Sequence, residues 1–148
     1  MSDQIEYCIN RASAAEIAAH LLRCDSEFKP RLSARVDIQV YAAKIHARAM
    51  RFEARIDGAL VGLVATYCND LGGRPAYITS VSVLPPHQGQ GIAAQLMRKC
   101  LEHVQHLGLG QIELEVDERS LPAIGLYRKL GFATAQANKT SLKMSMTL

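Results

Sequence analysis

The stretch from Tyr77 to Ala94, YITSVSVLPPHQGQGIAA, constrains the fold of this chain more than any other. It begins with β-branched residues typical of a strand, and Pro85–Pro86 ends that strand because proline cannot donate to a β-ladder. Gly89 and Gly91 follow, and apolar residues then recur at helical spacing to about residue 107. The stretch therefore predicts a strand, a tight glycine loop and a helix.

A strand, a glycine loop and a helix in this order form a site suited to an anion. The first amides of a helix have no partner within the helix, and they lie at the positive end of its dipole. Glycines carry no side chain that would keep a ligand away from these amides. We therefore expect the loop to bind a phosphate or diphosphate group.

Two other kinds of phosphate loop fit this sequence less well. No Gly-Lys-Ser/Thr follows at the required spacing, which excludes a Walker A motif. Residues 89–94, GQGIAA, match the G-x-G-x-x-A pattern of dinucleotide-binding oxidoreductases. In that pattern the first glycine directly follows the strand, whereas residues 85–88 intervene here. An oxidoreductase that binds a dinucleotide stays an alternative.

Two motifs resemble those of the GCN5-related N-acetyltransferase (GNAT) family, which binds acetyl-coenzyme A (acetyl-CoA). Residues 88–93, QGQGIA, are similar to the family's Q/R-x-x-G-x-G/A motif, and the preceding VSVLP resembles its strand ending. Residues 123–132, AIGLYRKLGF, are similar to its A-x-x-L-Y-x-x-x-G-F signature. The resemblance covers roughly residues 50–135 well and the N-terminal third in outline.

The other periodic segments predict a complete α/β order in one domain, residues 1–148. Strands are expected at 5–9, 50–56, 59–68, 111–117, 132–138 and 142–148, and helices at 14–24, 37–48 and 120–130. Ser13 with Glu16 predicts a capping box, Asp57-Gly58 a hairpin turn, and Ser120 an N-cap. The family resemblance implies a mixed, mostly antiparallel sheet with one parallel strand pair and helices on both faces.

Composition excludes several classes of protein. The net charge of +3 is small and dispersed, so we expect no nucleic-acid partner. No apolar run approaches the roughly 20 residues that cross a bilayer, and residues 1–8 resemble no secretory signal. The four cysteines are scattered, and His103 with His106 have no evident third ligand, so we expect no metal and a cytoplasmic protein.

The resemblance assigns roles in holding acetyl-CoA. It implies that main-chain amides of Gln88, Gly89, Gln90, Gly91, Ile92 and Ala93 contact the diphosphate. It also implies that Val81 and Val83 pair with the pantetheine between two separated strands, with the Val83 amide facing the thioester oxygen. Ser120 is expected near the coenzyme, and Tyr127 is expected to protonate the departing sulfur.

The general base is less well defined. Thr79 stands where the family commonly has a carboxylate, and Glu115 on the neighbouring strand is the expected replacement. The rivals are Glu53, Asp70, His46 and a water held by Tyr67 or Tyr77. Free alkyl amines have a pKa of about 10, so an amine acceptor has to lose a proton near neutral pH.

These observations predict an N-acetyltransferase that moves an acetyl group from acetyl-CoA to a primary amine of a small molecule, such as an amino sugar or other metabolite. The protein is expected as a monomer or homodimer. The alternative is a non-catalytic acyl-CoA-binding sensor, which Thr79 permits. The expected acceptor region contains polar residues that are able to hold a substrate, but their mixed charges do not indicate which acceptor it is. These residues are Arg31, Arg35, Tyr41, Lys44, Tyr67, Asn69 and Asp70.

Overall fold

A computed structural model of the chain describes residues 4–69 and 71–148. In chain order its helices and strands are β1 (Ile5–Ile9), α1 (Ala14–Cys24), α2 (Ile38–Arg48), β2 (Met50–Ile56), β3 (Ala59–Tyr67), β4 (Ala76–Val83), α3 (Ile92–His106), β5 (Gln111–Asp117), α4 (Leu121–Leu130), β6 (Ala133–Ala137) and β7 (Ser141–Thr147). Short 3₁₀ helices lie at Asp25–Glu27, Leu32–Ala34 and Pro85–His87. Every predicted helix and strand is present, with ends that differ by a residue or so.

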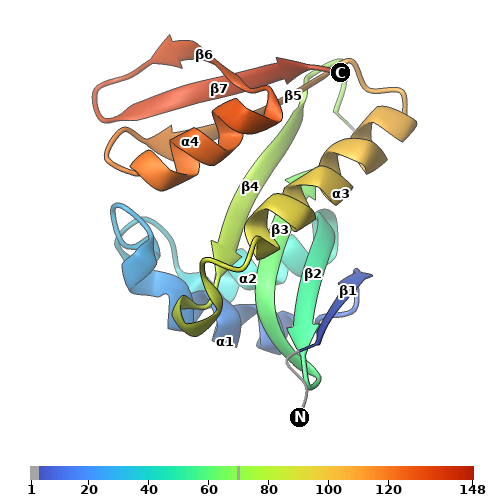
Figure 1. The fold of residues 1–148 in the computed structure, drawn as a ribbon, viewed down its shortest axis with the longest axis vertical. Helices are drawn as coiled ribbons and strands as arrows, with labels where there is room; N and C mark the ends of the chain where they lie inside the picture. Colours follow the sequence, from blue (N-terminus) through green and yellow to red (C-terminus); the bar gives the residue numbers. More distant parts are fainter. Residues whose placement is uncertain (1–3, 70) are drawn as a thin grey trace.

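The strands form one mixed sheet in the order β1-β2-β3-β4-β5-β7-β6 (Figure 1). β4 and β5 are parallel, and each of the other neighbouring pairs in the described chain is antiparallel. α3 connects β4 to β5, and a crossover of this kind is what parallel neighbours require. The predicted fold class, a mostly antiparallel sheet with one parallel pair, is confirmed.

Helices cover both faces of the sheet, as predicted (Figure 1). One apolar cluster joins α1 and α2 to Leu60, Leu63 and Ala65 of β3. A second, larger cluster joins α3 and α4 to the sheet and includes Val61 and Val64 of the same strand. β3 therefore contributes to the core on both sides, as its continuous apolar sequence predicts.

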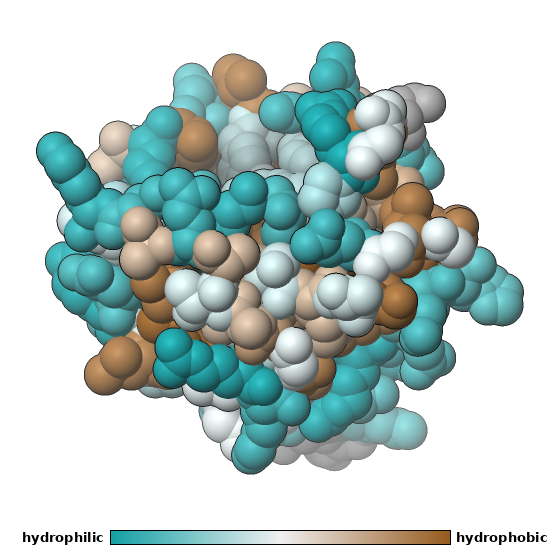
Figure 2. Space-filling model, turned by 90° about the horizontal axis from the view of Figure 1, so that it is seen from above, coloured by the Kyte–Doolittle hydropathy of each residue, from teal (hydrophilic) through white to brown (hydrophobic). Residues whose placement is uncertain are grey.

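The β6–β7 hairpin forms one end of the molecule. β7 lies between β5 and β6 and pairs with β5 over its whole length, from Ser141 to Thr147. β6 is the edge strand and is exposed at every position. The space-filling view of that end shows pale and brown side chains bordered by hydrophilic ones (Figure 2).

Two of the three predicted caps and turns are confirmed. Ser13 Oγ accepts the Glu16 amide at 3.1 Å, and the Glu16 carboxylate accepts the Ser13 amide at 3.1 Å, which completes the capping box. Asp57 and Gly58 have φ of 50° and 79°, as a two-residue hairpin turn requires. Ser120 occupies the predicted N-cap position of α4, but its side chain does not cap the helix. Its hydroxyl makes no capping hydrogen bond because its backbone, at ψ 64°, is not in the extended conformation that directs a side chain to the first turn.

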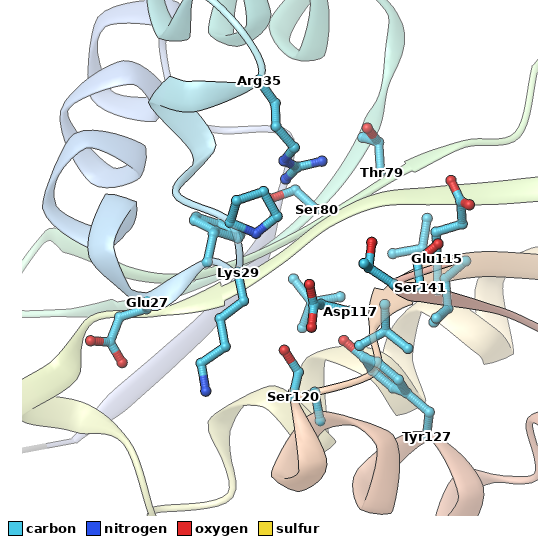
Figure 3. Close-up of a pocket in the computed structure, with 18 of the residues that line it drawn as sticks. Glu27, Lys29, Arg35, Thr79, Ser80, Glu115, Asp117, Ser120, Tyr127 and Ser141 are labelled. Carbon is cyan, nitrogen blue, oxygen red and sulfur yellow. The ribbon is translucent and has the colours of Figure 1, made fainter. Parts of the chain in front are cut away.

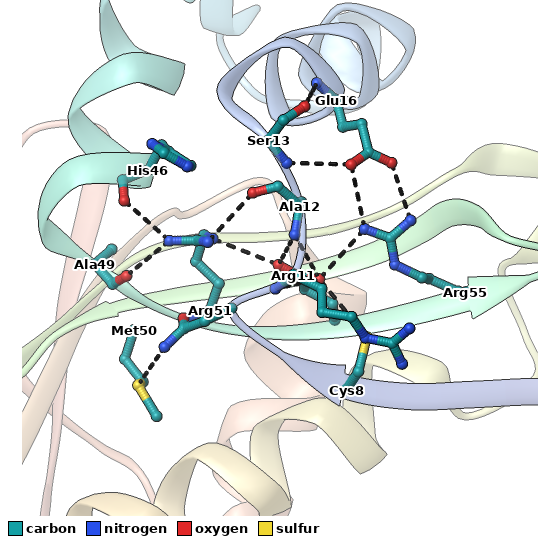
Figure 4. Close-up of polar contacts among 12 residues, drawn as sticks. Cys8, Arg11, Ala12, Ser13, Glu16, His46, Ala49, Met50, Arg51 and Arg55 are labelled. Atoms are coloured by element: carbon teal, nitrogen blue, oxygen red, sulfur yellow. Dashed lines mark hydrogen bonds and ion pairs between the residues drawn. The ribbon is translucent and has the colours of Figure 1, made fainter.

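A buried carboxylate attaches the start of α1 to β2. Glu53 is fully buried, and its carboxylate accepts the Arg11 amide at 3.2 Å and the Ala12 amide at 3.0 Å. Two guanidinium groups balance its charge: Arg51 Nε lies 3.4 Å and Arg55 Nη2 3.6 Å from its oxygens. Figure 4 shows the Arg51 side chain extending toward Ala12, just before α1, and the Arg55 side chain extending toward Glu16 in the first turn of α1. The Glu53 carboxylate therefore serves the fold, which removes it from the rivals for the general base.

Replacing Glu53 with glutamine is expected to destabilise the protein by about 3 kcal/mol, because Arg51 loses its counter-charge in a buried position. Urea unfolding measures the free energy of unfolding of each variant. The matched control is Glu6→Gln, which removes an exposed carboxylate 2.6 Å from Arg11 and should cost less than about 1 kcal/mol. Equal losses in the two variants would contradict this account.

Candidate active site

The parallel strands β4 and β5 separate part-way along their length. Only three residue pairs join them: Ala76 with Ile112, Tyr77 with Glu113 and Ile78 with Leu114. Both strands continue beyond these pairs, β4 to Val83 and β5 to Asp117. The edges that face each other after the third pair are therefore not joined by a ladder, which is the splayed arrangement implied by the family resemblance.

A bulge at Thr79 marks the point of separation. The residues on either side of Thr79 pair with consecutive residues of β3, Thr66 and Ala65, so Thr79 has no opposite residue. An extra residue of this kind bends a strand and increases its twist. Tyr41 of α2 holds the bulge: its hydroxyl donates to the Thr79 carbonyl at 2.7 Å and lies 2.7 Å from Thr79 Oγ1.

A cavity of about 450 Å³ occupies the gap between the separated strands (Figure 3). One wall comes from β4 and β5, a second from the segment between α1 and α2, and a third from α4 and the start of β7. The polar residues of its lining are Glu27, Lys29, Arg35, Tyr77, Thr79, Ser80, Glu115, Asp117, Ser120, Tyr127, Thr140 and Ser141. Of the residues assigned from the sequence, Val81, Glu115, Ser120 and Tyr127 meet here.

Tyr127 reaches the cavity from α4. It is 6% exposed, and its ring packs edge-on against Phe132, with centroids 6.0 Å apart. Burial raises the pKa of its hydroxyl to about 12, because the charged phenolate is poorly solvated there. The hydroxyl is therefore protonated near neutral pH and is able to donate a proton or a hydrogen bond into the cavity.

Asp117 was not assigned from the sequence, yet it lies in the cavity wall at the end of β5. Arg119 binds it through two side-chain hydrogen bonds, Nε to Oδ1 at 2.9 Å and Nη2 to Oδ2 at 3.0 Å. This guanidinium lowers the pKa of Asp117 to about 2, so the group is ionised and weakly basic near neutral pH. The two side chains pair with each other. The position of Asp117 in the cavity wall is not marked by any motif in the sequence.

The glycine loop leads directly into α3 with its amides available. Gly91 is the N-cap residue at φ 77°, and Gly89 has φ 84°, conformations that favour glycine. Within the described chain, the amides of residues 89–94 donate to no protein acceptor. Space around both glycines is open, since no atom lies within 4 Å of a Cβ built on either. The loop therefore has the form expected of an anion site.

Gln88 plays a different part in this loop. Its amide donates to the Pro85 carbonyl at 3.3 Å, so it does not belong to the set of available amides. Its side-chain nitrogen donates to the Val83 carbonyl at 3.1 Å and to Glu27 Oε1 at 3.0 Å. Gln88 thus connects the end of β4, the glycine loop and the segment after α1. Val83 lies at this junction and outside the cavity lining.

The structure places only some of the candidates for the general base at the cavity. Glu115 lines the cavity and is exposed, with Asn138 Nδ2 3.4 Å from its carboxylate. Tyr77 also lines it, whereas His46 and Tyr67 do not. Asp70 lies outside the described residues. Glu115 and a water held by Tyr77 are the candidates that the geometry brings to the cavity.

The described residues contain no group of three or more His, Cys, Asp or Glu side chains placed to hold a metal ion. They also contain no helix long and apolar enough to cross a membrane.

The chain resembles known acetyltransferases in sequence. Streptothricin acetyltransferase from Streptomyces lavendulae is 35% identical over 101 residues, which are 61% of this chain and 53% of that protein. Mycothiol acetyltransferase from Saccharomonospora viridis is 41% identical over 71 residues, 47% of this chain and 23% of that one. The chain thus spans about half the length, or less, of these curated relatives.

Solved structures share the fold over nearly the whole chain. The PaiA N-acetyltransferase from Thermoplasma acidophilum, in complex with coenzyme A, has a TM-score of 0.73 at 12% identity, covering 97% of this chain and 99% of that one. The putative acetyltransferase yncA from Salmonella typhimurium, with acetyl-CoA, has a TM-score of 0.75 at 18% identity, covering 97% and 94%. The model of the "Acetyltransferase (GNAT) family" matches residues 15–132. The separated strands, the glycine loop and this match together lead to one conclusion: the chain belongs to the GNAT acetyltransferase family.

Proposed function

We propose that residues 1–148 act as a single domain that transfers an acetyl group from acetyl-CoA to a primary amine of a small molecule. The observation that carries this proposal is the cavity between β4 and β5, which Tyr127 lines, together with the available amides of the glycine loop, which Gln88 connects to the end of β4. Two relatives are named for streptothricin and mycothiol, and these names support a small-molecule acceptor.

The residues present suit the coenzyme. The positive end of α3 stabilises the diphosphate, which accepts hydrogen bonds from the main-chain amides of Gly89, Gln90, Gly91, Ile92 and Ala93. The pantetheine forms hydrogen bonds with main-chain groups on the unpaired edge of β4 around Val81, in the way that a neighbouring strand would. Val83 supplies an amide for the thioester oxygen, and Ser120 lies beside the coenzyme. Solved relatives of the same fold that hold coenzyme A or acetyl-CoA support this assignment.

Three proton transfers complete the reaction. Glu115, or a water next to it, takes a proton from the ammonium group of the acceptor, which frees the nitrogen lone pair to attack the thioester carbon. As the carbon–sulfur bond breaks, Tyr127 donates its hydroxyl proton to the sulfur, and the nitrogen releases its second proton to solvent, from which Tyr127 regains one. A hydroxyl with a raised pKa keeps its proton until this step.

The second candidate is a non-catalytic acyl-CoA sensor. Thr79 has no carboxylate, and its hydroxyl is already engaged with Tyr41 at 2.7 Å, which favours this alternative. A screen of amines that follows thiol release, together with calorimetry of coenzyme A binding, separates the two. Release with at least one amine supports the transferase, whereas tight coenzyme binding without release from any amine supports the sensor.

Gly91→Ala is expected to weaken coenzyme A binding about tenfold or more, because a Cβ at the N-cap projects among the amides assigned to the diphosphate. Calorimetry gives the dissociation constant. Gly108→Ala is the matched control: Gly108 follows the same helix at φ 80° with open space around it, so it carries the same backbone strain away from the site. Equal affinity in the two variants would refute the loop assignment.

Tyr127→Phe is expected to lower kcat by about a hundredfold while coenzyme affinity stays unchanged, because phenylalanine keeps the ring packing and loses the proton donor. Steady-state thiol release and calorimetry give the two quantities. An unchanged kcat would rule out the acid role.

Glu115→Gln is expected to lower kcat/KM at neutral pH by about a hundredfold, with part of the loss recovered at high pH, where more of the amine is already deprotonated. Glu113→Gln is the control on the same strand; Glu113 pairs with Lys143 at 3.4 Å and lies outside the cavity lining. If both variants keep wild-type rates, the base is not Glu115.

A further inference from the structure

Arg35 differs from the other cations that the sequence placed near the acceptor. Arg31 lies 3.7 Å from the Asp25 carboxylate, and the Lys44 ammonium lies 5.3 Å from the centre of the Tyr67 ring. Arg35 lines the cavity, and its side chain makes no hydrogen bond or ion pair within the described chain. Its guanidinium is therefore available to a ligand.

A buried hydroxyl without a partner lies near this guanidinium. Ser80 is 6% exposed, lines the cavity, and its Oγ has no hydrogen-bond partner among the described residues. Figure 3 shows the Ser80 hydroxyl and the Arg35 guanidinium directed to the same part of the cavity, next to Thr79. A buried hydroxyl without a partner costs free energy, so a ligand that accepts its hydrogen bond gains that energy.

At the end of the cavity that contains Glu27, Lys29 and Asp117, the two carboxylates already have partners. Glu27 accepts a hydrogen bond from Gln88 at 3.0 Å, and Arg119 binds Asp117 at 2.9 and 3.0 Å. Arg119 has the largest effect in lowering the pKa of Asp117, and the charge of Lys29 adds to it, although Lys29 makes no hydrogen bond or ion pair within the described chain. Because both carboxylates have partners, that end offers no free pair of opposite charges.

The other end of the cavity has two charges of opposite sign, Arg35 and Glu115. Burial has the largest effect in raising the pKa of the Tyr77 hydroxyl; Glu115 and Glu113 raise it further, and Arg35 lowers it. Tyr77 therefore lies within the electrostatic reach of both groups. A ligand beside Tyr77 is therefore within the electrostatic reach of a cation and an anion that line the same cavity.

We propose that the acceptor carries a carboxylate near its amine, and that Arg35 with Ser80 binds this carboxylate while Glu115 receives the amine. The planar guanidinium forms two parallel hydrogen bonds with a carboxylate, and the serine hydroxyl donates a third. The substrate class is then an amino acid or an amino-acid-like metabolite. This inference rests on the proposed acetyl transfer and specifies the acceptor at the same site.

Acceptor pairs that differ only in the carboxylate test the inference: L-phenylalanine with phenethylamine, and L-lysine with cadaverine. Thiol release gives kcat/KM for each compound. We expect the wild-type protein to prefer the acid of at least one pair by about tenfold or more, and Arg35→Gln to reduce that preference by about tenfold, chiefly through KM. Ser80→Ala should reduce it less, and the control Arg31→Gln should preserve it. A wild-type protein without this preference, or Arg35→Gln that keeps it, would overturn the inference.

If no amine leads to thiol release, the acetyltransferase proposal fails. Calorimetry then tests the carboxylate site separately, because it measures binding without turnover. N-acetyl-L-phenylalanine and N-acetylphenethylamine are titrated into the wild-type complex with coenzyme A and into the Arg35→Gln complex. Tighter binding of the acid to the wild-type protein, weakened about tenfold by Arg35→Gln, supports the carboxylate site. Equal binding of the two compounds, or no binding of either, overturns it.

Discussion

The separation of β4 from β5 at Thr79 is the structural constraint on which the site depends. Two parallel strands joined along their whole length would leave no cavity and no free main-chain edge. The bulge bends β4 away, and contacts from the opposite face of the sheet compensate for the lost pairing. Tyr41 bonds to Thr79 at 2.7 Å, and buried His20 of α1 lies 2.9 Å from the Ser82 hydroxyl. α1 and α2 therefore hold the open half of β4 in position, and the segment between them forms one wall of the site.

The position of α3 follows from close packing on β3. A Cβ at Gly62 would lie 2.8 Å from Ile92 Cγ2 and 3.2 Å from Leu96 Cδ1, so glycine permits the first turn of the helix to contact the sheet. The same turn presents the available amides of the loop. Gln88 connects the loop to the end of β4 through the Val83 carbonyl, at 3.1 Å. The glycine at Gly62 and the side chain at Gln88 thus fix the anion site relative to the open strand edge.

Local sequence patterns predicted the helices and strands, whereas the arrangement of the strands in one mixed sheet was implied by the family resemblance. Periodicity identified each helix and strand, and Asp57-Gly58 and the Ser13 capping box determine conformation within a few residues. The site was predicted in part, because the motifs around Gly91 and Tyr127 are also local. The bulge at Thr79 and the approach of Arg35 to Ser80 depend on contacts between distant segments, which no spacing encodes. Asp117 and Arg119 are only two residues apart, but no motif marks Asp117 as part of the cavity wall. Ser120 shows the limit of local signals, since a typical capping residue lines the cavity without capping its helix.

A crystal structure of the protein with acetyl-CoA tests the central claim most directly. The account predicts diphosphate oxygens about 3 Å from the loop amides at Gly89–Ala93, and pantetheine along the free edge of β4 with the thioester sulfur near the Tyr127 hydroxyl. A coenzyme bound on another surface, with those amides unengaged and the gap between β4 and β5 empty, would contradict it.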